Sequence, residues 1–151
     1  MMDSNEARAA LDKVGETDRR MAEQMTWPIW RHAAFGFIEA LLLLGLALPL
    51  AGMAACLVIA MAGLSWIIHD DRARYGMFVS GYSSRAARPA ILLAFAIFAG
   101  GIAAIFLTGG LNTWNSWTPV IVTVVFVGET LASIWWQALH QADLRRSGTD
   151  A

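Results

Sequence analysis

Two acidic residues lie inside long apolar stretches of the chain. An ionisable side chain in such a stretch is a candidate to bind a proton or an ion. Glu39 is the one charged residue between positions 33 and 68, and Glu129 lies near the middle of the apolar stretch 119–140. A charged acid at the bilayer centre costs on the order of 3 kcal/mol by insertion scales, so such acids usually face protein. We interpret the two as a candidate proton or ion site. The alternative is that each is a protonated glutamate that hydrogen-bonds neighbouring helices together.

Three histidines, each at the end of an apolar stretch, form a second candidate set. His32, His69 and His140 have acidic neighbours that include Asp70 and Asp143. Imidazole and carboxylate groups are common ligands of divalent metals, so convergence of these ends would create an interfacial metal site. The alternative is that histidine simply suits the membrane interface.

Other catalytic patterns are missing from the sequence. It has one cysteine, Cys56, and no nucleophile–base pattern, phosphate-binding loop or redox motif. Nothing in it argues for an enzyme, and no cofactor is predicted.

The composition places these residues in a membrane protein. The chain has 151 residues, 57% hydrophobic and 15% charged, whereas soluble domains have about 25% charged residues. The stretch 33–68 would be about 54 Å long as one helix, but the hydrocarbon core is about 30 Å thick. It must therefore fold back, and Pro49 and Gly52 mark the turn.

We predict an all-α integral membrane protein with four transmembrane helices in two hairpins, preceded by an amphipathic helix. The segments are a cytoplasmic helix at 1–26, a transmembrane domain at 27–140 and a tail at 141–151. The spans are predicted at about 32–50, 52–69, 90–108 and 119–140.

The basic residues predict the orientation. All 11 Lys and Arg lie in the N-terminal segment, in the central polar segment 69–89, which is predicted to be a loop, or in the tail, and the other two connectors have none. The positive-inside rule then places both termini and the central segment in the cytoplasm.

Two polar segments are candidate contact surfaces. An apolar stripe on residues 3–25 includes Leu11, Val14 and Met21 and predicts a helix on the membrane surface or a contact with a partner. The central segment favours anionic lipid head groups or a docked protein. Its candidate contact residues are Arg72, Arg74, Tyr75, Arg85 and Arg88. A nucleic-acid partner is not expected, because the basic residues are interleaved with acids.

Two short stretches carry a resemblance to a known group. Pro28–His32 (PIWRH) precedes the first span, and Arg74–Gly81 (RYGMFVSG) follows the second. Together they resemble uncharacterised small bacterial four-span membrane proteins, over about the first 90 residues. The resemblance implies this architecture and a bacterial inner-membrane location, and it implies no activity.

The sequence leaves two functions open. The first is a non-enzymatic membrane module that acts as scaffold, accessory subunit or sensor partner, as a homo-oligomer or within a larger complex. A chain this small is not expected to enclose a path alone. The alternative is a small proton- or cation-coupled transporter or channel that uses Glu39 and Glu129.

Overall fold

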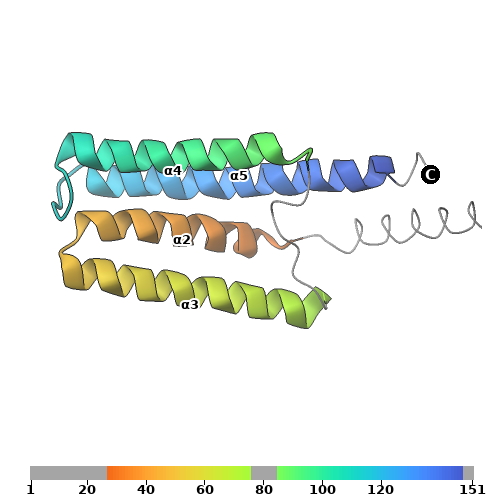
Figure 1. Cartoon of the computed structure of the whole chain (residues 1–151), viewed down its shortest axis with the longest axis horizontal. Coiled ribbons are helices and arrows are strands. Elements are labelled where there is room, and N and C mark those ends of the chain that lie inside the picture. The colour runs from red at the N-terminus through yellow and green to blue at the C-terminus, as the bar shows by residue number, and fades with distance from the viewer. Residues whose placement is uncertain (1–26, 76–84, 148–151) are drawn as a thin grey trace, which may run out of the picture.

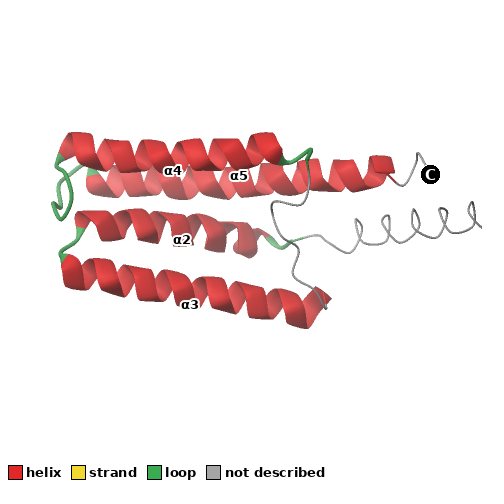
Figure 2. Cartoon of the chain, in the orientation of Figure 1, coloured by secondary structure: helices red, strands yellow, loops and turns green. Residues whose placement is uncertain are grey.

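The structure, a computed structural model, describes residues 27–75 and 85–147, which include four helices (Figures 1 and 2). These are α2 (Ile29–Ala47), α3 (Leu50–Tyr75), α4 (Arg88–Thr108) and α5 (Thr118–Ser147). Each helix is long and apolar enough to cross a membrane, so the prediction of four such helices is confirmed. The helix predicted at 1–26, with Leu11, Val14 and Met21, lies outside the described residues.

Each helix runs antiparallel to the one before it in the chain (Figure 1). The two ends of the bundle differ in charge. The start of α2, the end of α3, the start of α4 and the end of α5 lie together at what we call the basic end. The opposite, uncharged end is formed by Leu48, Pro49 and residues 109–117, which hold no charge. Every described arginine lies at the basic end: Arg31, Arg72, Arg74, Arg85, Arg88, Arg145 and Arg146.

Two helix boundaries differ from the prediction. α3 continues to Tyr75, so Asp70, Asp71 and Arg72 are helical and the prediction that they belong to a loop was wrong. No glycine or proline occurs between residues 64 and 75 to end the helix where it leaves the apolar region. α5 continues in the same way past His140 to Ser147.

The first turn lies slightly earlier in the chain than predicted. α2 ends at Ala47 and α3 begins at Leu50, so the chain reverses over Leu48 and Pro49. The carbonyl oxygen of Pro49 accepts a hydrogen bond from the backbone N–H of Met53. Gly52 therefore lies inside α3, and its predicted place in the turn was wrong.

α2 is the central helix of the bundle. It packs against α5, α3 and α4, and α4 also packs against α5, whereas α3 contacts α2 alone among the described helices. One apolar core joins α2, α4 and α5 around Leu43, Ile105 and Val125. A second joins α2 and α3 around Ile38 and Ile67. This arrangement holds two faces of α2 against different helices.

Candidate functional site

Gly36 brings α2 and α5 into close contact. A Cβ atom at this position would lie 2.6 Å from the backbone oxygen of Phe126 and 3.0 Å from the backbone nitrogen of Thr130. Only a residue without a side chain permits this approach of two helix backbones. His32 and Glu39 lie one turn to either side of Gly36 on α2. Both are therefore held near α5.

Glu129 is a buried acid on the facing helix. Its side chain is 6% exposed, and its Oε1 atom has no hydrogen-bond partner among the residues that the structure describes. Leaving a buried polar group unsatisfied costs about 1–3 kcal/mol. Glu39, which is partly buried, lies close enough for the two carboxylates to interact electrostatically. The structure thus brings together the two acids that the sequence singled out.

The two acids lie at similar depths in the bundle. α2 ends and α5 begins at the uncharged end. At about 1.5 Å per residue, Glu39 lies about 12 Å and Glu129 about 17 Å from that end. Both are therefore well inside the apolar region, where water does not readily stabilise a charge.

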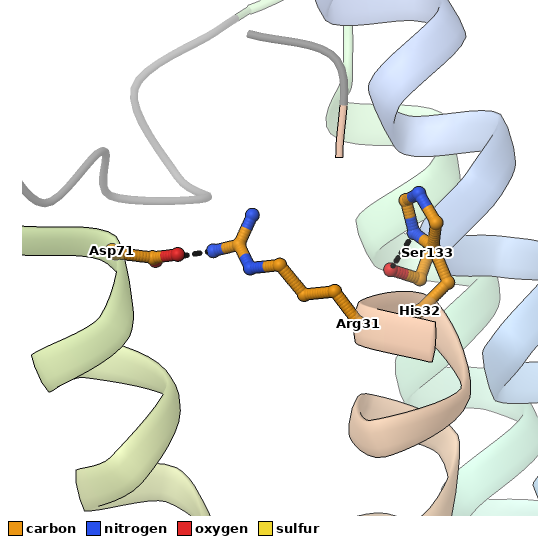
Figure 3. A network of polar contacts seen from close by, with 4 residues as sticks. All are labelled: Arg31, His32, Asp71 and Ser133. Atoms are coloured by element: carbon orange, nitrogen blue, oxygen red, sulfur yellow. Dashed lines mark hydrogen bonds and ion pairs between the residues drawn. The ribbon is translucent and has the colours of Figure 1, made fainter. Parts of the chain in front are cut away.

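His32 links α2 to α5 at a level between Glu129 and the basic end. The imidazole is 3% exposed. Its Nε2 lies 2.8 Å from Oε1 of Gln137 and donates to that carbonyl oxygen, and its Nδ1 lies 2.8 Å from Oγ of Ser133. In the neutral ring, Nδ1 then accepts a hydrogen bond from the Ser133 hydroxyl. Figure 3 shows His32 against Ser133.

Arg31, the residue before His32, points away from α5 and links α2 to α3 (Figure 3). Its guanidinium forms an ion pair with Asp71, and the two residues are 2% and 3% exposed. The guanidinium carbon also lies 3.3 Å from the ring centroid of Trp27, a cation–π contact. This ion pair fixes the basic end of α3 to the start of α2.

A stack of rings closes the basic end between α2, α4 and α5. Trp27 stacks on Trp136 with centroids 5.0 Å apart, and Trp136 stacks on His140 at the same distance. Ala87 and Ala90, at the start of α4, pack against Trp136. Trp27 also lies against His32, with ring centroids 5.8 Å apart.

The predicted metal-binding set is not assembled. His69 and Asp70 belong to α3, whereas His140 and Asp143 belong to α5, and these two helices do not contact each other. His140 and Asp143 do interact electrostatically within α5. In the described ranges, no three His, Cys, Asp or Glu side chains form a group that could hold a metal ion. His32 uses both ring nitrogens in hydrogen bonds to α5.

The predicted lipid-contact residues lie at the basic end. Arg72, Arg85 and Arg88 are exposed, and Arg74 and Tyr75 form the end of α3. This placement agrees with contact to anionic head groups, which stays a prediction.

Sequence reasoning missed the polar partners within the bundle. It did not pair Arg31 with Asp71, because Asp71 had been placed in a loop. It also overlooked that Glu129, Ser133 and Gln137 are spaced four residues apart, which puts them on one helix face. That spacing was the one available signal for a polar stripe on α5.

No protein-family model, curated protein or solved structure significantly matches the chain.

Proposed function

We propose that the protein uses Glu39 and Glu129 as a reversible protonation site in proton-coupled transport across a membrane. The observation that supports this most directly is the burial of Glu129, whose Oε1 has no hydrogen-bond partner among the described residues and whose carboxylate interacts electrostatically with Glu39 on the facing helix. Buried acids in membrane helices commonly belong to ion or proton pathways. A purely structural glutamate would be expected to have its hydrogen bonds satisfied.

A proton suits this pair better than a divalent metal. Two carboxylates in one apolar site repel each other when both are ionised, and one shared proton removes most of that repulsion. Calcium typically takes about 6–8 oxygen ligands, and structural zinc four ligands. The described residues supply only the two acids at this depth. A monovalent cation remains the alternative occupant.

The charge asymmetry of the bundle supports an orientation in the membrane. Because basic residues favour the cytoplasmic side, we place the basic end and both termini in the cytoplasm. Resemblance to small bacterial membrane proteins favours the bacterial inner membrane. Protons would then reach Glu129 from the cytoplasm through the basic end and leave toward the uncharged end, or travel in reverse.

The Glu129→Gln variant tests this function in lipid vesicles. We expect wild-type protein to carry protons into vesicles under an imposed membrane potential, as measured by an internal pH-sensitive dye. The variant should fall to the rate of protein-free vesicles, because glutamine has nearly the same shape but exchanges no proton. Glu39→Gln should retain a slower flux, since Glu129 is the more buried acid.

Ser65→Ala is the matched control, because Ser65 is an exposed residue of α3 that bonds only within its own helix, to the Met61 oxygen. It should carry protons at the wild-type rate. A wild-type flux no faster than that of empty vesicles would refute the transport role. Equal fluxes for wild type and Glu129→Gln would show that Glu129 does not carry the proton.

The accessory-subunit role stays a prediction, as does assembly with further copies of the chain. Among the described helices, α3 packs on α2 only, and it exposes Leu57, Val58, Met61 and Trp66. Lipid alone can cover such a face in a membrane. The acid pair is therefore the stronger basis for a function.

A further inference from the structure

We propose that a groove between α2 and α5 binds the transported substrate, a small lipophilic cation such as an amine with apolar substituents. This inference rests on the proposed function, because it names the class of molecule whose transport Glu129 couples to protons. It is carried by an apolar groove beside two acids for which the apolar part of the described chain supplies no basic partner.

The groove has a volume of about 170 Å³ and is formed by α2 and α5. It lies on the side of Gly36 that faces the uncharged end, and Phe37 in its wall is 54% exposed. The groove therefore opens on the outer surface of the bundle, where a membrane would place lipid. Its walls include Phe37, Ala40 and Leu44 of α2 and Val122, Thr123 and Phe126 of α5.

Glu129 lies close to one end of this groove. Phe126 lines the groove and is three residues from Glu129 on α5. Side chains with this spacing are neighbours on a helix, with Cβ atoms about 5–6 Å apart. The groove ends near Gly36, where the backbones of α2 and α5 touch at the Phe126 carbonyl oxygen. A charged group at this end of the groove would lie about one helical turn from Glu129.

The charge of the two acids is not balanced inside the bundle. Residues 33–71 and 89–144 contain Glu39 and Glu129 but no lysine or arginine. An ionised carboxylate in apolar surroundings attracts a cation strongly, because little water screens the charge. A positively charged ligand in the groove would supply the missing countercharge.

Few other ionisable groups act on Glu129. On α2 they are Glu39, which acts on it electrostatically, and His32, whose two ring nitrogens are both within hydrogen-bond distance of α5. On α5, His140 lies three turns away toward the basic end. The charged residue of α4 is Arg88 at the basic end, and α3 does not contact α5. The two acids therefore determine how the charge beside the groove changes with pH.

The walls of the groove favour an organic cation over a metal ion. The hydroxyl of Thr123, the side-chain oxygen in the walls, donates a hydrogen bond to the backbone oxygen of Pro119. Hard metal ions need several oxygen ligands, whereas the rings of Phe37 and Phe126 can attract an ammonium group through their faces. The volume equals that of about six water molecules, which suits an ammonium group with one aromatic substituent.

Binding of the cation and protonation of Glu129 oppose each other. As the cation enters, the Glu129 carboxyl group releases its proton to water, and the carboxylate balances the charge of the ligand. When the carboxylate regains a proton, only one O–H bond forms and the ligand loses its countercharge. Because such coupling is reciprocal, protons should weaken cation binding and the cation should displace protons.

The test measures binding of radiolabelled benzyltrimethylammonium to the full-length protein in phosphatidylcholine nanodiscs, with empty nanodiscs subtracted. This ligand keeps its charge at every pH. We expect its dissociation constant to be about tenfold or more higher at acid than at alkaline pH, since protonation removes a charge about one helical turn away. Neopentylbenzene, which has a carbon atom in place of the nitrogen, should displace the ligand poorly.

Two variants locate the site. Glu129→Gln, which keeps the shape of the side chain, should bind the ligand about tenfold more weakly at alkaline pH, for the same electrostatic reason. Thr123→Trp should prevent binding, because the exposed Thr123 lines the groove and the larger side chain fills it. Val124→Trp is the matched control: Val124 is the next residue on α5 and is 62% exposed, and it should bind like the wild type.

Each failure has a distinct meaning. Wild-type protein that carries no protons in the vesicle assay would overturn the proposed function itself. Wild-type protein that carries protons but binds the ammonium no better than empty nanodiscs do would overturn the substrate assignment alone. Equal binding at acid and alkaline pH, or equal displacement by the neutral compound, would also overturn it, by showing a groove that takes any apolar molecule. Unchanged binding in Thr123→Trp would place the ligand outside the groove.

Discussion

The Asp71→Ala variant is expected to lose about 3–5 kcal/mol of unfolding free energy, the usual loss when one partner of a buried ion pair is removed. Arg31 is 2% exposed and forms its ion pair with Asp71 across the α2–α3 contact. Without that carboxylate, the guanidinium charge stays buried with much less to offset it. Because α3 contacts only α2 among the described helices, we expect the basic end of α3 to separate first.

Unfolding in increasing mole fractions of sodium dodecyl sulfate, followed by circular dichroism, gives this free energy. Arg72→Ala is the matched control: its side chain is exposed one residue along α3, and a change within about 0.5 kcal/mol is expected. The double variant Arg31→Met with Asp71→Leu should recover most of the loss, because it removes both charges together. Equal stabilities of Asp71→Ala and Arg72→Ala would show that the ion pair contributes little.

The Gly36→Ala variant is expected to destabilise the bundle by about 1–3 kcal/mol, as overpacking of a close contact does. The added methyl group would meet the Phe126 carbonyl oxygen and the Thr130 backbone, which cannot rotate away as a side chain can. α2 and α5 must then move apart. The same change should weaken the electrostatic interaction between Glu39 and Glu129, so proton flux should fall although neither acid is altered.

Gly100→Ala provides the matched control for this second variant. Gly100 lies in α4, and a Cβ atom there would meet no atom within 4 Å. Alanine is a better helix former than glycine by up to about 1 kcal/mol, so this variant should be unchanged or slightly more stable. If both variants unfold at the same detergent concentration, the close approach of α2 and α5 at Gly36 does not hold the bundle together.

The four helices could be predicted from the sequence because bilayer thickness limits the length of an apolar helix. The stretch 33–68 is too long for one crossing, and Pro49 marks the reversal. The helix ends were harder to predict from the sequence, since a helix continues past the apolar region wherever no glycine or proline breaks it. Asp71 shows the consequence: assigned to a loop, it could not be paired with Arg31.

The two acids were also predictable, because Glu39 and Glu129 contrast with the apolar residues around them. Their proximity was not, since it depends on which helices pack together. Nothing in the sequence alone decided that α2 would lie between α3 and α5. The close approach at Gly36 depends on the same packing. The hydrogen bonds of His32 to Ser133 and Gln137 likewise join residues more than 100 positions apart.

Infrared titration of the protein in lipid tests the central claim most directly, namely that Glu129 changes its protonation state inside the membrane. Spectra recorded from acid to alkaline pH report the carboxylic-acid C=O band of buried acids. We expect a band that appears as the pH falls in the wild type and that is absent from Glu129→Gln, while Ser65→Ala retains it. The same set of bands in wild type and Glu129→Gln at every pH would contradict the account.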